Sequence, residues 1–180
     1  MATPGRRGVG SAMTKPTDGL ERALLASLNV TLENMAFEQA FLRQGDDFDI
    51  APDSTWLWAR LNILNPVTGK MFIRVERACA EQLTENILGP DPEENGEAIS
   101  DPMLFDAMAE LINTVAGRFL QKLVADGKDF GIGLPDTGIG SCCDEKTDEV
   151  TRVAFEIAGQ HHLIIGVQGN DLIALAMNRG

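Results

Sequence analysis

Residues 101–126 read DPMLFDAMAELINTVAGRFLQKLVAD, and this stretch decides the fold. Asp101 followed by Pro102 is typical of a helix start, with the aspartate as N-cap and the proline at the first helical position. Gly127 is a typical residue just beyond a helix end. The sequence therefore predicts one long helix from Asp101 to about Asp126.

The predicted helix has two distinct faces. At about 100° per residue, its large apolar side chains fall on one broad arc. They are Phe105, Met108, Leu111, Ile112, Val115, Phe119 and Leu123. Asp106, Glu110, Asn113 and Gly117 lie on nearly the opposite side, at spacings that keep them within reach of one another. We refer to these four residues as the polar ridge and expect it to point away from the core.

The polar ridge has two interpretations. An outward face is normally polar, so solubility alone could explain it. Against this, asparagine is a middling helix former and glycine costs about 1 kcal/mol relative to alanine. A carboxylate such as Glu110 can pair with a lysine of a partner. A carboxamide such as Asn113 can hold a water through its oxygen and contact a phosphoryl group through its nitrogen, and phosphoryl transfer rewards such positioning.

The rest of the chain predicts a mixed architecture. Asp18 and Glu21 resemble a capping box, and apolar residues at helical spacing predict a first helix over 19–42. Alternation predicts a hairpin of strands 55–64 and 71–75, followed by a short helix over 78–88. Further strands are predicted over 130–134, 153–157, 163–167 and 172–177, with a loop over 136–149. This order indicates an α+β fold with helices on one face of a mainly antiparallel sheet.

Length and composition favour one domain over residues 18–180, preceded by a flexible N-terminal segment, 1–17. The chain has 27 acidic and 15 basic residues, a net charge of −12 that matches nucleic acid poorly. It suits a partner presenting lysine or arginine, or serves solubility alone. No apolar run reaches the roughly 20 residues that span a bilayer. We therefore expect a cytoplasmic protein.

Several other features allow two interpretations. Gly131, Gly133, Gly138 and Gly140 could form a phosphate loop, but they lack the Gly-Lys-Ser/Thr ending, so a tight strand exit is favoured. Trp56 and Trp58 could mark a dimer contact or, as we favour, pack against a helix. Cys142 and Cys143 could be redox-responsive or ordinary thiols. His161 and His162 are expected in a turn, and no Cys/His set has zinc spacing, so no metal site is expected.

With these residues in place, the chain resembles the chemotaxis phosphatases of the CheC/CheX/FliY group, in particular the CheX-like branch. The family signature is Asp or Ser, three residues, Glu, two residues, Asn, and a Pro some twenty residues later. Here it reads Asp106, Glu110, Asn113 and Pro135, with Gly117 matching the small residue after the Asn. The element order also fits, and the resemblance covers roughly residues 20–177.

The resemblance implies a phosphatase acting on the aspartyl-phosphate of a CheY-like response regulator. Asn113 would orient the attacking water and Glu110 would contact the receiver lysine, with Asp106 and Gly117 binding the partner beside them. The family implies no cofactor on this chain; Mg²⁺ is expected on the partner receiver.

The family fold contains two related halves, and the first helix carries Asn29, Glu33 and Ala36 at the corresponding place. Because Ala36 replaces the asparagine, one site per chain is expected. The CheX-like branch also implies a homodimer joined through sheet edges. The alternatives are a non-catalytic module that binds a receiver domain, and a purely structural dimerisation domain.

Overall fold

The computed structural model describes residues 17–43, 55–89, 99–124, 128–140, 149–157, 159 and 161–179. Two expectations fall outside these residues. They are the flexible N-terminal segment up to residue 16 and the Cys142–Cys143 pair.

The centre of the fold is a sheet of seven strands in which every pair is antiparallel. The strand order is β1-β6-β7-β3-β2-β4, and β5 also pairs with β2. The strands are β1 (Ala40–Leu42), β2 (Trp56–Asn65), β3 (Gly69–Glu76), β4 (Gly131–Ile132), β5 (Asp136–Ile139), β6 (Val150–Ile157) and β7 (His161–Gln168). The predicted hairpin is present as β2 and β3, with Ala59 opposite Ile73.

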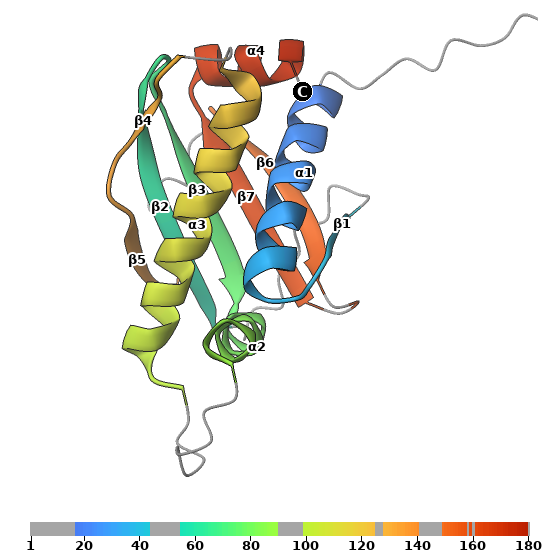
Figure 1. Cartoon of the computed structure of the whole chain (residues 1–180), viewed down its shortest axis with the longest axis vertical. Coiled ribbons are helices and arrows are strands. Elements are labelled where there is room, and N and C mark those ends of the chain that lie inside the picture. Colours follow the sequence, from blue (N-terminus) through green and yellow to red (C-terminus); the bar gives the residue numbers. More distant parts are fainter. Residues whose placement is uncertain are drawn as a thin grey trace, which may run out of the picture.

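The helices of the described residues are α1 (Asp18–Met35), α2 (Arg77–Leu88), α3 (Asp101–Leu123) and α4 (Asn170–Arg179). In Figure 1, α1 and α3 lie side by side across one face of the sheet, with α2 near one end of this layer and α4 near the other. The predicted fold class, α+β with helices on one face of an antiparallel sheet, is confirmed.

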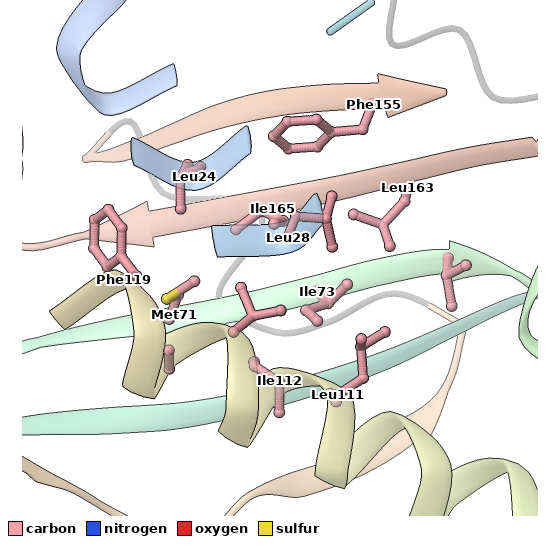
Figure 2. Close-up of a cluster of buried hydrophobic side chains, with 14 of the residues drawn as sticks. Leu24, Leu28, Met71, Ile73, Leu111, Ile112, Phe119, Phe155, Leu163 and Ile165 are labelled. Carbon is pink, nitrogen blue, oxygen red and sulfur yellow. The ribbon is translucent and has the colours of Figure 1, made fainter. Parts of the chain in front are cut away.

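The core lies between the sheet and the pair α1 and α3 (Figure 2). Each element turns one face inward: Leu24 and Leu28 from α1, Leu111 and Phe119 from α3, and alternate residues of the central strands such as Ile73 are all buried. Burying one such side chain contributes roughly 1.5–3 kcal/mol. This packing determines the rotation of α3 about its axis, and therefore which of its side chains point outward.

The predicted first helix over 19–42 is too long, because α1 ends at Met35. Phe37 has a φ of 55°, a left-handed conformation that ends the helix and turns the chain. Residues 40–42 then form β1, which pairs with β6. The helical spacing of apolar residues could not reveal this turn, since phenylalanine rarely adopts it.

The last predicted strand, 172–177, is also wrong: these residues belong to α4. Its buried residues, Leu172 and Ala176, are four apart, which is the helical spacing. Gly169, with a φ of 122°, makes the turn from β7 into this helix. A short apolar run does not distinguish strand from helix by its periodicity.

The expected loop 136–149 begins with a strand, since β5 pairs with residues 57–60 of β2. Glycine and aspartate favour turns in isolation, but the free edge of β2 supplies hydrogen-bonding partners.

The ends of α3 also differ from the prediction: Ser100 is the N-cap, and the helix ends at Leu123. The expected capping box at Asp18 is replaced by Thr17, whose hydroxyl donates to Glu21 at 2.8 Å.

Candidate functional site

The polar ridge lies on the side of α3 that faces away from the core. All the apolar residues predicted for the opposite face are buried except Phe105, which is partly buried. Asp106 and Glu110 are exposed, while Asn113 and Gly117 are partly buried. The four residues lie along one side of a continuous helix, so a single partner surface can contact all of them.

The side chains of the polar ridge are little used within the chain. The Thr114 hydroxyl, one turn beyond Glu110, donates to Glu110 Oε1 at 3.3 Å. Among the described residues, no hydrogen bond or ion pair engages the side chains of Asp106 or Asn113. The carboxamide of Asn113 therefore keeps both its donor and its acceptor for a ligand.

Gly117 has no packing reason to be glycine. A Cβ built at this position would meet no atom within 4 Å, and the residue sits inside a regular helix. Glycine in such a position destabilises a helix by about 1 kcal/mol relative to alanine. The absence of a side chain leaves the helix backbone open to close approach from outside, one turn beyond Asn113.

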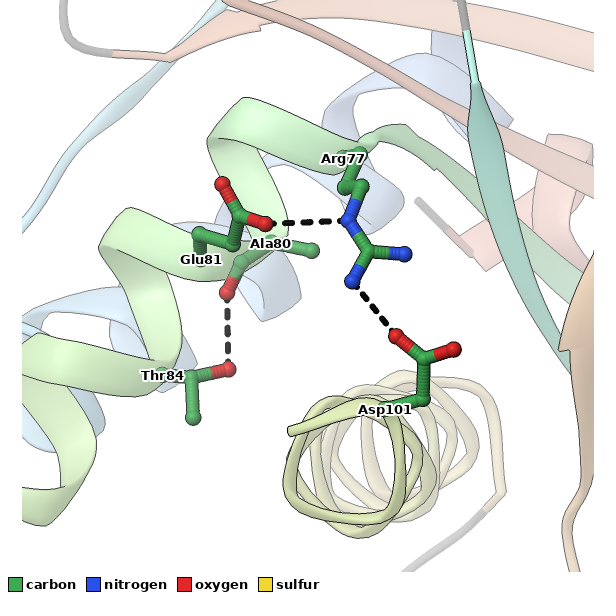
Figure 3. A network of polar contacts seen from close by, with 5 residues as sticks. All are labelled: Arg77, Ala80, Glu81, Thr84 and Asp101. Atoms are coloured by element: carbon green, nitrogen blue, oxygen red, sulfur yellow. Dashed lines mark hydrogen bonds and ion pairs between the residues drawn. The ribbon is translucent and has the colours of Figure 1, made fainter. Parts of the chain in front are cut away.

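Both ends of α3 are fastened to the rest of the molecule. At the start, the Arg77 guanidinium pairs with Asp101 and, through Nε, with Glu81 at 2.9 Å (Figure 3). The hydrogen bonds to Asp101 and then to Glu81 raise the pKa of Arg77, so it remains charged. At the other end, Arg179 of α4 donates from Nη1 to the Leu123 carbonyl at 3.1 Å. These contacts hold α3, and with it the polar ridge, in one position.

The segment that carries the predicted Pro135 lies beside α3. Strands β4 and β5 border β2 and contact α3, and Pro135 is partly buried between them. Backbone hydrogen bonds fix this segment: Gly133 N–H donates to the Asn62 carbonyl, and Gly140 N–H donates to the Trp56 carbonyl, both at 2.7 Å. The signature proline therefore lies in the sheet edge next to α3.

The corresponding part of α1 is used for structure. Asn29 Nδ2 donates to the Ala40 carbonyl at 3.0 Å, and Ala40 N–H donates back to Asn29 Oδ1 at 2.6 Å. Glu33 accepts a hydrogen bond from Gln39 Nε2 at 3.1 Å. Ala36, at 1% exposure, caps the helix. The chain already uses these groups, so this region offers no free carboxamide to a ligand.

The tryptophans do not pack against a helix as predicted. They alternate with the core residue Leu57 and so lie on the other face of the sheet. There, the Arg74 guanidinium lies 4.8 Å from the Trp56 ring centroid and the Arg60 guanidinium 5.4 Å from that of Trp58. Gly138 is a close-packing position on this face, because a Cβ there would lie 2.5 Å from the Trp58 ring.

His161 and His162 begin β7 instead of forming a turn, and their Nδ1 atoms lie 3.8 and 3.2 Å from Glu76 carboxylate oxygens. Cys79 is buried, and burial raises the pKa of its thiol to about 12, so it is unreactive near neutral pH.

Within the described ranges, no group of three or more His, Cys, Asp or Glu side chains could hold a metal ion. In the same part of the chain, no helix has the length and apolarity needed to cross a membrane.

Solved structures of similar fold include CheX proteins. A CheX from Vibrio vulnificus is 19% identical, with a TM-score of 0.64 over 86% of this chain and 98% of its own. A CheX from Desulfovibrio desulfuricans is 16% identical, with a TM-score of 0.65 over 84% of this chain and 99% of its own. The matched chain in a complex of CheX with CheY, BeF₃ and Mg²⁺ from Borrelia burgdorferi is 18% identical. Its TM-score is 0.53 over 82% of this chain and 95% of its own. At such identities the likeness establishes the fold, which is of the CheX type.

The sequence itself supplies the family. Residues 57–157 match the family model described as Chemotaxis phosphatase CheX. The chain therefore belongs to the CheX family of chemotaxis phosphatases, as the signature on α3 predicts. No curated protein sequence matches the chain.

Proposed function

We propose that this protein hydrolyses the aspartyl-phosphate of a CheY-like receiver domain, with Asn113 orienting the attacking water and Glu110 contacting the receiver lysine. The observation that carries the proposal is the placement of both side chains on the outward face of α3, where no described residue engages the Asn113 carboxamide. Membership of a phosphatase family supports the reaction class.

The proposed chemistry needs positioning more than acid–base catalysis. Water attacks phosphorus in line, the bond between phosphorus and the aspartyl oxygen breaks, and the carboxylate and inorganic phosphate are released. The Asn113 carboxamide oxygen accepts a hydrogen bond from the water, and its nitrogen donates to a phosphoryl oxygen. The water's proton leaves with the phosphate, so no general base is needed from this chain. We expect Mg²⁺ to be held by the receiver.

Glu110 and its neighbours supply docking. The hydrogen bond from the Thr114 hydroxyl limits the conformations of the Glu110 side chain. Less conformational entropy is then lost when Glu110 pairs with a lysine ammonium on the partner. Asp106 is exposed one turn before Glu110, at the rim of the same surface. The missing side chain of Gly117 allows the partner to approach the helix backbone closely.

The test measures loss of phosphate from receiver domains of the same genome, each phosphorylated with a small phosphodonor. Wild-type protein should accelerate the loss and leave small phosphomonoesters untouched. Asn113→Ala should reduce turnover by about 100-fold while the circular dichroism stays unchanged. Asn178→Ala, which removes an exposed asparagine of α4, is the matched control.

Equal turnover by wild type and Asn113→Ala would show that the mechanism is wrong. Wild type that binds a phosphorylated receiver without accelerating phosphate loss would instead support the non-catalytic binding module.

We also propose the homodimer that the family resemblance implies, joined through a sheet edge. Strand β1 forms one edge of the described sheet, and its residue Phe41 is 60% exposed. Exposed edge strands are ready templates for pairing with another chain. Phe41→Asp should shift the protein from dimer to monomer in analytical ultracentrifugation, and an unchanged mass would exclude this edge.

A further inference from the structure

A second feature of the helical face lies beside the polar ridge. Between α1 and α3 there is a cavity of about 230 Å³. We call it the α1–α3 groove; it is lined by Ala26, Ser27 and Val30 from α1 and by Arg118, Gln121 and Lys122 from α3. Its α1 wall is largely apolar and its α3 wall is basic.

The cations of the groove lack partners within the part of the chain that the structure describes. Arg118 Nε is buried without a hydrogen-bond partner, and no described carboxylate pairs with Arg118 or Lys122. A buried donor without an acceptor is unfavourable, and a ligand that supplies an acceptor relieves this. Two such neighbouring cations are notable in a chain whose net charge is −12. The groove is therefore suited to an anion.

The side chains that could recognise this anion are on α3. The Ser27 hydroxyl hydrogen is already donated to the Ala23 carbonyl at 2.7 Å. The available donors are the Arg118 guanidinium, the Lys122 ammonium and the Gln121 carboxamide. Val30, which is 39% exposed, offers an apolar surface to the methylene groups that carry a carboxylate. This combination fits the side chain of an aspartate or glutamate.

The groove lies within the footprint expected for a partner on the polar ridge. Arg118 follows Asn113 by five residues, which is about 8 Å along the helix axis and about 140° around it, on the side that faces α1. One side of a typical protein interface buries about 800 Å², which corresponds to a disc with a radius of roughly 16 Å. A domain that contacts Asn113 and Glu110 and extends over the side of α3 that faces α1 therefore reaches the groove.

The two halves of α3 present opposite charges to such a partner. Asp106 and Glu110 make its first half acidic, and Arg118 and Lys122 make its second half basic. A partner that offers a cation to Glu110 and a carboxylate to the groove can bind in only one direction along the helix. Complementary charges of this kind determine register as well as rate of association.

We propose that the α1–α3 groove binds a carboxylate side chain of the receiver domain and thereby aligns the phosphoryl group with Asn113. This inference rests on the proposed function, since it assumes a receiver docked on the polar ridge. Arg118, Gln121 and Lys122 act here as docking residues and touch no reacting atom.

The test compares Lys122→Glu and Arg118→Gln with Arg152→Glu, which makes the same charge change as Lys122→Glu on the sheet face away from the helices. The probe is the receiver that wild type binds best from the same genome, loaded with beryllofluoride and Mg²⁺. Lys122→Glu should weaken its binding by about tenfold, and Arg118→Gln by a smaller factor. Turnover at saturating phosphorylated receiver should also fall, by less than in Asn113→Ala, because a receiver that the groove does not align presents its phosphoryl group to Asn113 less well.

Charge reversal on the receiver identifies the carboxylate. One aspartate or glutamate of the receiver, changed to lysine, should restore the affinity lost in Lys122→Glu. Binding that weakens no more in Lys122→Glu than in Arg152→Glu overturns the groove proposal. Loss of self-association in Lys122→Glu, with receiver affinity unchanged, would assign the groove to a second copy of the chain and also overturn it.

The outcomes separate this proposal from the proposed function. If Asn113→Ala loses turnover but Lys122→Glu binds the receiver normally, the phosphatase proposal stands and the groove proposal is excluded. If Lys122→Glu weakens receiver binding but wild type has no turnover, the groove proposal stands and the phosphatase proposal is excluded. Wild type that binds no receiver would exclude both.

Discussion

Helices α1 and α3 lie side by side on the same face of the sheet, and each carries an asparagine and a glutamate outside the core. In α1, Asn29 holds both backbone groups of Ala40, and Glu33 accepts from Gln39. In α3, none of the described residues forms a hydrogen bond or ion pair with the Asn113 side chain, and Thr114 is the one described residue that hydrogen-bonds to the Glu110 carboxylate. The same residue types therefore perform structural work in one helix and remain available in the other.

This difference shows that residue type and exposure do not by themselves identify a functional side chain. Asn29 and Asn113 are both partly buried. What distinguishes them is whether the chain already satisfies their hydrogen-bonding groups. The following predictions test the distinction, beginning with the largest expected effect.

Asn113→Asp should lose about as much phosphatase turnover as Asn113→Ala, on the order of 100-fold. A carboxylate cannot donate to a phosphoryl oxygen and repels its negative charge. Single-turnover phosphate release at saturating receiver measures this effect. Near wild-type turnover in Asn113→Asp would show that the carboxamide nitrogen is not needed.

Asn29→Ala should have the opposite effect to the Asn113 variants. It should lower the free energy of unfolding by roughly 2 kcal/mol and leave turnover per folded molecule unchanged. The substitution leaves the Ala40 N–H and carbonyl without their partner in α1. Urea denaturation measures the change, with Asn34→Ala as the control because Asn34 is exposed on the same helix. Equal stability of the two variants would contradict a structural role for Asn29.

The glycines of the two helices provide a second contrast. A Cβ at Gly19 of α1 would lie 2.8 Å from the Met177 carbonyl oxygen, whereas a Cβ at Gly117 would meet nothing. Gly19→Ala should therefore destabilise the protein by about 1–2 kcal/mol, and Gly117→Ala should stabilise it by about 0.5–1 kcal/mol.

Receiver titrations of the same two variants complete this test. Gly117→Ala should bind the receiver more weakly than wild type does, in spite of its greater stability. Unchanged receiver affinity in Gly117→Ala would remove Gly117 from the docking surface.

Glu110→Ala should weaken receiver binding by about fivefold, since it removes one charged contact at an interface. Glu33→Ala removes an exposed glutamate of α1 and should leave receiver binding within experimental error. Isothermal titration of both variants against the same receiver measures the difference. Equal weakening would indicate a general charge effect, not a contact of Glu110.

The sequence predicted α3 and its two faces well because a 23-residue helix repeats its periodicity several times. The β2–β3 hairpin was predicted because the alternation of inward and outward residues also repeats several times along its strands. It did not predict β1, β5 or α4, which are short and depend on tertiary partners: β1 on Asn29 and β6, β5 on the edge of β2, and α4 on α1. The Leu172 and Ala176 spacing, with Asp171 in the first turn and Arg179 in the last, was a signal that could have revealed α4.

The site was predictable only in part. Helical spacing indicates that Glu110 and Asn113 share the outward face, but it does not assign them a reaction. The α1–α3 groove was not foreseen, because residues about ninety positions apart form it only when the two helices pack together. The use of Asn29 also depends on a turn at Phe37 that no spacing rule indicates.

The attachment of α3 at both ends has an evolutionary consequence. Asp101 is fixed by Arg77, and the Leu123 carbonyl by Arg179, so the length between them is constrained. Inserting one residue would rotate everything beyond it by about 100°, and an insertion between Glu110 and Asn113 would turn the two side chains out of line with each other. Insertions and deletions within this helix should therefore be selected against, while substitutions along its outer side remain permissible. New partner preferences in this lineage would then arise by point mutation on a helix of constant length.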